Sequence, residues 1–177
     1  PRIAVTTGDP AGIGPEVCLD LLADSGIAAQ CTPIVLGDRA ILERCAEATG
    51  KPAPQTIISV EEVPRASQPS LLEVPSISLD QFEPGTVNPA TGKAGYDYVA
   101  KAIDLALAGV VQGVATGPIN KEALSSAGIP HPGHTEIFAE RTKAERACMM
   151  LTSDVLTCSF VTAHVGYHEV PGLLSVE

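Results

Sequence analysis

Three loop segments of the sequence combine polar side chains with residues that bend the backbone. The first, residues 7–16, reads TGDPAGIGPE, and its glycines let the backbone approach a ligand while free N–H groups attract anions. It is not a Walker loop, which ends in Gly-Lys-Ser/Thr, nor a dinucleotide fingerprint, whose third glycine is replaced by Val17. A turn that only shapes one α/β crossover explains these residues equally well.

The second segment, residues 116–121, reads TGPINK and ends on Lys121. A lysine here could hold a carboxylate or phosphate, or act as a base if it were desolvated. Because a cation early in a helix opposes the helix dipole, the position favours a functional role. A solvated surface lysine is the alternative.

The third segment, residues 133–136, reads GHTE at a predicted helix start. The imidazole of His134 and the hydroxyl of Thr135 could clamp a small oxygenated ligand. Alternatively, Thr135 is the helix N-cap and His134 is a loop histidine with satisfied hydrogen bonds. His131, before Pro132, is expected to make no ligand contact.

A fourth position, His164, follows the strand-like run 159–163 and is the strongest single candidate for a functional residue. His168 lies four residues later, a spacing that would put two metal ligands on one face of a helix. Gly166 and the preceding strand argue against a continuous helix, so we predict that His168 is a surface residue.

Alternating strands and helices must position these segments. The apolar runs and turn residues of the first part predict strand, helix, strand, helix and strand at Ile3–Thr6, Pro15–Leu22, Pro33–Leu36, Arg39–Thr49 and Thr56–Val60. Residues 61–93 are rich in Pro, Ser and Gly, which predicts irregular surface chain with at most a short strand near Ile77–Leu79.

Helical periodicity and strand-like runs continue beyond this region. They predict a helix, a strand, two helices and two strands at Ala94–Val110, 114–116, 121–127, Thr135–Lys143, Cys148–Thr152 and Val155–Thr162. The alternation predicts an α/β domain with a mostly parallel sheet. Since ligands gather at the carboxyl ends of such strands, we expect Asp9, Lys121 and His164 to converge on one cleft.

Composition narrows the function classes. With 45% apolar and 18% charged residues, the chain of 177 residues is expected to fold. A formal charge of -10 and a content of 3% aromatic residues argue against binding to nucleic acid or to an anionic membrane. Five scattered cysteines without a C-x-x-C pair indicate a reducing, cytoplasmic setting. The abrupt ends predict that the 177 residues belong to a longer native chain.

Five motifs, taken in order, carry a family resemblance. Residues 7–16, 116–121, 132–136 (PGHTE), 149–151 (MML) and 161–164 (VTAH) together resemble the 4-hydroxythreonine-4-phosphate dehydrogenase family of vitamin B6 biosynthesis. The match in order and approximate spacing extends over the whole sequence. Members of that family run to roughly twice this length, the usual size of two domains.

The resemblance implies an α/β/α dehydrogenase similar in fold to isocitrate and isopropylmalate dehydrogenases, with residues 1–177 as its N-terminal half. Its active site would lie between domains at a homodimer interface. It also implies that His134 and Thr135 bind substrate, and that His164 is one of three histidine ligands to a divalent metal (Zn, Mg, Mn or Co). The other metal ligands, and the basic residues that bind the substrate phosphate, would lie outside residues 1–177. Lys121 and Asp9 are then candidates for polar or proton-transfer roles.

The implied reaction oxidises the secondary alcohol of 4-phosphooxy-L-threonine with NAD or NADP. The β-keto acid formed would lose carbon dioxide to give 3-amino-2-oxopropyl phosphate. The closest alternative is a paralogue that oxidises D-threonate or D-erythronate 4-phosphate, and another is a catalytically silent half that only binds a phosphorylated metabolite. On this interpretation the 177 residues alone are expected to be inactive and to bind metal poorly.

Overall fold

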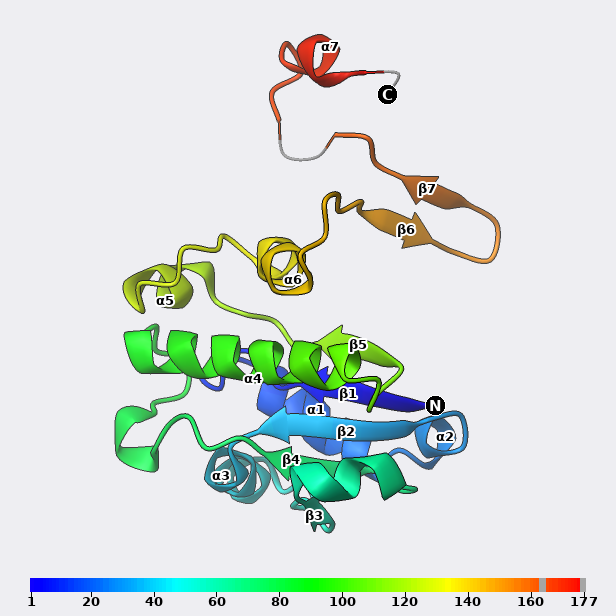
Figure 1. Ribbon diagram of the computed structural model, residues 1–177. Helices are drawn as coiled ribbons and strands as arrows, with labels where there is room; N and C mark the ends of the chain where they lie inside the picture. Colours follow the sequence, from blue (N-terminus) through cyan, green and yellow to red (C-terminus); the bar gives the residue numbers. More distant parts are fainter. Residues whose placement is uncertain (163–164, 176–177) are drawn as a thin grey trace.

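A five-stranded parallel sheet forms the centre of the molecule (Figure 1). The computed structural model describes residues 1–162 and 165–175. The strands lie in the order β3-β4-β2-β1-β5, with bounds β1 Arg2–Thr6, β2 Thr32–Gly37, β3 Ile57–Ile58, β4 Ser70–Glu73 and β5 Gly113–Thr116. All four strand pairs are parallel. The predicted α/β class with a mostly parallel sheet is confirmed.

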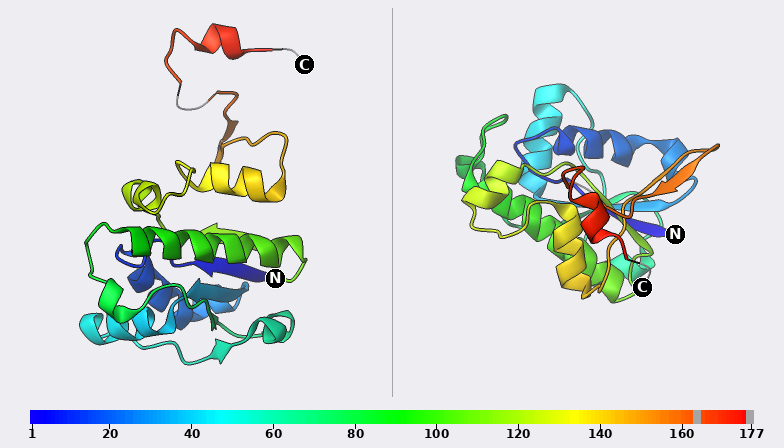
Figure 2. Two further views of the ribbon diagram at one scale, coloured as in Figure 1. Left: turned by 60° about the vertical axis from the view of Figure 1, so that its left-hand side comes forward. Right: turned by 90° about the horizontal axis from the view of Figure 1, so that it is seen from above.

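Helices cover both faces of this sheet (Figures 1 and 2). Their bounds are α1 Gly14–Ala23, α2 Ser25–Ala28, α3 Arg39–Thr49, α4 Pro89–Leu107, α5 Lys121–Ser126, α6 His134–Thr142 and α7 Val170–Leu173. Val35 of β2 packs with Leu19 of α1 and Leu42 of α3, whereas its neighbours Ile34 and Leu36 pack on the α4 side. Successive strand residues point to opposite faces, so this alternation builds two cores and three layers.

The Pro- and Ser-rich region is more ordered than its composition predicts. It contains the 3-10 turns Val60–Arg65 and Leu79–Gln81, and its strand is β4 rather than Ile77–Leu79. The strand prediction was wrong because the Asp38 carboxylate accepts the N–H groups of Ser76 and Ile77, 3.0 and 3.2 Å away, and so occupies donors that a neighbouring strand would need. Leu71 and Leu72 are buried instead.

Two element boundaries also differ from the prediction. Helix α4 begins at Pro89, five residues before the expected start, because the Asn88 side chain caps it by accepting the Thr91 N–H at 3.0 Å. The strand expected at Thr56–Val60 is limited to Ile57–Ile58, since the chain enters a 3-10 turn at Val60. Both differences arise where a cap or turn competes with the hydrophobic pattern.

The last part of the chain stands apart from the parallel sheet. Strands β6 (Met150–Thr152) and β7 (Thr157–Ser159) were predicted as strand-like runs, and they pair antiparallel with each other in a separate two-stranded sheet. In Figures 1 and 2, α5 and α6 lie beyond β5 next to α4, and the hairpin and α7 extend further in that direction. Among the described residues, no helix has the length and apolar character to cross a membrane.

Candidate active site

The carboxyl ends of β1 and β5 lie side by side and bring two of the predicted segments together. Thr6 and Thr116 are register partners, and the Gly117 N–H donates to the Thr6 carbonyl at 2.8 Å. One step further, the Asp9 N–H donates to the Pro118 carbonyl at 2.9 Å. The loops that carry Asp9 and Lys121 therefore form one surface. His164 lies outside the described residues, so its predicted convergence on this surface is untested.

Glycine is required where these loops touch. Gly8 has a left-handed φ of 72°, and a Cβ built there would lie 2.2 Å from the Pro118 carbonyl oxygen. At Gly14, a Cβ would lie 1.6 Å from the Thr7 carbonyl oxygen. Close packing of the backbone thus explains Gly8 and Gly14. The sequence alone allowed two explanations for the glycines of this loop, a ligand cradle or a simple turn.

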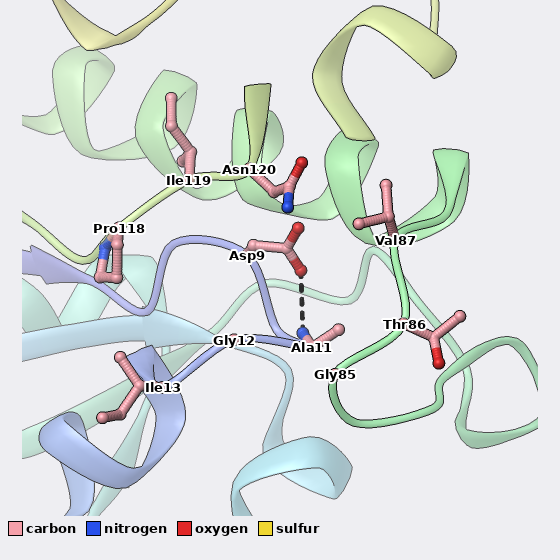
Figure 3. A pocket seen from close by; sticks show the side chains of 10 residues that line it. All are labelled: Asp9, Ala11, Gly12, Ile13, Gly85, Thr86, Val87, Pro118, Ile119 and Asn120. Carbon is pink, nitrogen blue, oxygen red and sulfur yellow. Dashed lines mark hydrogen bonds between the residues drawn. The ribbon is translucent and has the colours of Figure 1, made fainter. Parts of the chain in front are cut away.

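Asp9 lines a cavity of about 320 Å³ at this edge (Figure 3). The residue is 4% exposed, and its carboxylate accepts the Ala11 N–H at 2.9 Å and the Thr91 hydroxyl at 3.4 Å. Desolvation raises the pKa of this carboxyl above its ordinary value, although the two hydrogen bonds oppose the shift. Asn120 lines the same cavity from the loop after β5. A carboxyl that protonates more readily than usual suits a polar or proton-transfer role.

A second, larger groove lies beside α6 and has a volume of about 720 Å³. Its lining consists of Pro118, Ile119, Lys121, Pro132, Gly133, His134, Thr135, Glu136, Ala147, Met149, Phe160 and Val161. Two of these, Pro118 and Ile119, also line the cavity beside Asp9, so the two spaces share a wall. The groove thus gathers Lys121, His134 and Thr135, three of the five predicted site residues.

Thr135 is not the N-cap that the alternative interpretation expected. Helix α6 begins at His134, and the N-cap is Gly133, which makes no side-chain cap hydrogen bond. The side chain of Thr135, in the first turn, is exposed and lines the groove. Because no cap satisfies the first N–H groups of α6, they are available to an anionic or oxygenated ligand.

His134 is half-buried and incompletely satisfied. Its Nε2 is buried without a hydrogen-bond partner, while the imidazole is hydrogen-bonded to the backbone of Gly117. Desolvation lowers the pKa of His134, and the bond to Gly117 opposes this shift only in part. His134 is therefore neutral at pH 7 and can offer Nε2 to a ligand. Lys121, the exposed first residue of α5, adds an ammonium group to the same groove.

The other two histidines behave as surface and scaffold residues. The His131 ring stacks on Tyr96 with centroids 6.3 Å apart, and it lies outside the linings of both spaces. His168 is exposed, as predicted. Sequence reasoning missed Thr91 as a partner of Asp9, and it missed Phe160 in the groove wall. Met149, which also lines the groove, belongs to the MML motif of the family resemblance, although the sequence assigned it no site role. No local pattern marks Thr91 or Phe160, because each reaches the site from a distant element.

The described residues supply no complete metal site. Within residues 1–162 and 165–175, no three His, Cys, Asp or Glu side chains come close enough together to hold an ion. His164 is the one predicted ligand, and it falls outside these ranges. The side chains in these ranges therefore do not make a catalytic metal site by themselves, since such sites need about three protein ligands.

A parallel sheet with glycine-shaped loops, and with a histidine, a threonine and a lysine gathered in a groove beyond its carboxyl edge, defines an α/β protein whose groove suits a small polar ligand. The chain belongs to the PdxA family, since the family model described as "Pyridoxal phosphate biosynthetic protein PdxA" matches residues 29–177. This match confirms the family resemblance and covers α6 and its groove, whereas the loop at residues 7–16 precedes it.

Individual relatives agree with this assignment. A 4-hydroxythreonine-4-phosphate dehydrogenase from Trichlorobacter lovleyi is 39% identical over 100% of this chain and 54% of its own length. A protein from Symbiobacterium thermophilum, named as a candidate D-threonate 4-phosphate dehydrogenase, is 37% identical over 93% of this chain and 50% of its own length. The chain thus spans about half the length of the curated relatives it matches.

A solved structure extends the likeness to three dimensions. The crystal structure of a 4-hydroxythreonine-4-phosphate dehydrogenase from Burkholderia phymatum matches with a TM-score of 0.84 and 35% identity. The match covers 98% of this chain and 54% of that chain. The likeness therefore includes the residues after α6 as well as the parallel sheet.

Proposed function

We propose that the complete protein oxidises the secondary alcohol of 4-phosphooxy-L-threonine (4-hydroxythreonine 4-phosphate), with NAD or NADP as hydride acceptor. The observation that carries the proposal is the groove beside α6, where His134 with its unpartnered Nε2, Thr135 and Lys121 lie together in a member of the PdxA family. Residues 1–177 are, on this proposal, the N-terminal half of a two-domain homodimeric enzyme.

The groove residues suit the polar groups of this substrate. Because the ring N–H of neutral His134 is used in the bond to the Gly117 backbone, its Nε2 can accept from the substrate's alcohol O–H. The Thr135 hydroxyl can donate to a phosphate oxygen or accept from an alcohol. The ammonium group of Lys121 attracts a carboxylate or phosphate, and the uncapped N–H groups of α6 act in the same sense. Glu136 adds a carboxylate that can accept from the substrate's amino group. These residues bind and orient the substrate.

The removal of a proton and a hydride would give a β-keto acid, and its decarboxylation would yield 3-amino-2-oxopropyl phosphate. We assign Lys121 and Asp9 polar or proton-transfer roles around this reaction. His164 is proposed as one ligand of a divalent metal, whose other ligands lie outside the described residues because these contain no group of three metal-ligating side chains. The loop after β1 does not fit the dinucleotide by itself, since it lacks the fingerprint glycines and its cavity of about 320 Å³ is small.

One observation favours a second candidate substrate. The relative from Symbiobacterium thermophilum is nearly as similar to this chain as the first, and its name gives D-threonate 4-phosphate as substrate. That compound has a hydroxyl where 4-phosphooxy-L-threonine has an amino group. The complete protein should therefore be assayed with both compounds by NADH or NADPH formation.

The expected result is a higher kcat/KM for 4-phosphooxy-L-threonine, and a higher value for D-threonate 4-phosphate would select the alternative. His134→Ala should lower kcat/KM by about 100-fold, the size expected when one well-placed hydrogen-bonding group is lost from an active site. His168→Ala, at an exposed histidine, is the matched control and should leave it unchanged. Wild-type activity in His134→Ala would remove His134 from the site, and binding without oxidation of either compound would favour a silent binding protein.

A further inference from the structure

Helix α6, which presents His134 and Thr135, is attached to the rest of the molecule by few apolar contacts. Its one fully buried side chain is Ile137, which packs against Val99 and Ile103 of α4. A helix of nine residues is too short to be stable by itself in water, so its position depends on tertiary contacts. The partly buried Phe138 packs against the same cluster, and Arg141 in the last turn forms a 2.7 Å ion pair with Asp104 of α4. None of these contacts comes from His134 or Thr135 in the first turn.

Polar and aromatic contacts also anchor the chain just before α6. The His131 ring lies nearly parallel to the Tyr96 ring, at an interplanar angle of 10°. Its Nε2 lies 2.8 Å from a carboxylate oxygen of Glu140. We call Tyr96, His131 and Glu140 the α6 clasp. The His131 side chain is only 12% exposed, whereas the Glu140 side chain is 67% exposed, so His131 is the enclosed centre of this group.

The clasp joins three parts of the chain, which are α4, α6 and the loop that leads into α6. Tyr96 belongs to α4, Glu140 lies in the last turns of α6, and His131 lies three residues before His134 in the preceding loop. Between His131 and α6 the chain passes through Pro132 and Gly133, and Gly133 has no side chain that could fix its direction. His131 is thus the nearest anchor upstream of the groove residues.

We propose that His131 is a positioning residue, which holds the first turn of α6 so that His134 and Thr135 are presented to the groove. The part of this proposal that concerns substrate rests on the function proposed above. The part that concerns the placement of His134 stands on the clasp geometry and can be tested without substrate.

The direct test is an NMR titration of the His134 imidazole in the 177-residue chain, which has four histidines and hence few signals to assign. In the wild type, burial lowers the pKa of His134. If the clasp is lost, the first turn of α6 loosens, water reaches the imidazole, and the pKa of His134 should rise toward its ordinary value. His131→Ala should show this rise, and His168→Ala should not.

Two further controls separate positioning from general stability. Leu42→Ala removes a core side chain on the opposite face of the sheet and should lower the melting temperature without moving the pKa of His134. His131→Phe keeps the ring stack but loses the contact with Glu140, whereas His131→Gln keeps a hydrogen-bond donor but loses the ring. Each should raise the pKa of His134 less than His131→Ala does, and these two variants carry the test if His131→Ala does not fold. An unchanged pKa of His134 in all His131 variants would overturn the proposal.

The complete protein gives the second arm of the test. Misplacement of His134 and Thr135 should raise KM more than it lowers kcat, with a loss in kcat/KM of up to about 100-fold, as for a displacement of about 1 Å in an active site. If the complete protein oxidises neither compound but His131→Ala still shifts the pKa of His134, the proposed function fails and the clasp stands. If His134→Ala is impaired but the His131 variants match the wild type in both measurements, the clasp fails and the proposed function stands.

Discussion

The α/β body, residues 1–142, and the segment that follows it are held in shape by different interactions. In the body, both faces of the sheet are closed by cores in which Leu36, Leu42, Leu72 and Tyr98 have at most 1% of their surface exposed. After Thr142, no residue in the described ranges 143–162 and 165–175 is buried. The body therefore depends on long-range burial, and the following segment does not.

The hairpin shows what local interactions achieve without a core. Its strands are joined by a backbone ladder, by a Ser153 N–H bond to the Leu156 carbonyl at 2.8 Å, and by a 2.7 Å contact between the Thr152 and Thr157 hydroxyls. Its apolar side chains are exposed, with Leu151 at 60% and Val155 at 93%. A two-stranded hairpin of this kind is at best marginally stable in water. Turn and ladder interactions therefore specify which strands pair, whereas burial supplies most of the stability.

The largest contrast between the two regions is expected for glycine substitutions. Gly14→Ala would place a Cβ 1.6 Å from the Thr7 carbonyl oxygen, so the backbone at the start of α1 must shift. We expect a loss of about 4 kcal/mol or more in the free energy of unfolding, enough to unfold a marginally stable domain. Gly172→Ala, in α7, meets no atom within 4 Å and should be neutral or slightly stabilising. Urea denaturation measures both, and a mild effect of Gly14→Ala would show that the turn adapts.

Leucine truncations should give the next largest difference. Leu72→Ala removes a side chain that is 1% exposed and should cost about 2–5 kcal/mol in the free energy of unfolding. Leu151→Ala, at 60% exposure in β6, should change it by less than about 0.5 kcal/mol. Equal losses for the two variants, measured by the same denaturation, would mean that the hairpin contributes to a common core.

Tyrosine hydroxyls allow a finer comparison. The Tyr98 hydroxyl donates to the Asp38 carboxylate at 2.6 Å in the buried core. Tyr98→Phe leaves that carboxylate without one of its donors and should cost about 1–3 kcal/mol in the free energy of unfolding. Tyr167→Phe, at a side chain that is 94% exposed, should have no measurable effect. A neutral Tyr98→Phe would imply that another donor replaces the hydroxyl.

The smallest effect is a dependence of stability on pH that the body alone should show. Burial raises the pKa of Asp38 above its ordinary 3.8, although the hydrogen bonds from Tyr98 and the backbone oppose the shift. The folded state then binds more protons than the unfolded state between 3.8 and the raised pKa, so this contribution is present below 3.8 and is lost as pH rises through the folded-state pKa. Asp38→Asn should flatten this slope in denaturation at several pH values, while Asp154→Asn in the exposed hairpin turn should not.

The sequence indicated the parallel α/β architecture because its strands and helices alternate with clear periods. It also marked His134, Thr135 and Lys121, since each stands beside a glycine- or proline-containing turn after a strand or before a helix. The strand predicted in the Pro-rich region was wrong, because the secondary-structure preference of each residue there is weak. The Asp38 carboxylate, which is far away in sequence, decides which N–H groups are free to pair with a strand.

What the sequence by itself determined is therefore the order and class of the elements, the family, and the residues able to do chemistry. The tertiary structure decided which of them meet. It joined the loops of Asp9 and Lys121 through the pairing of β1 with β5, made Gly133 rather than Thr135 the cap of α6, and buried the unpartnered nitrogen of His134. Periodicity and turn chemistry are local properties and can be read along the chain, but desolvation and contact depend on residues that only folding brings together.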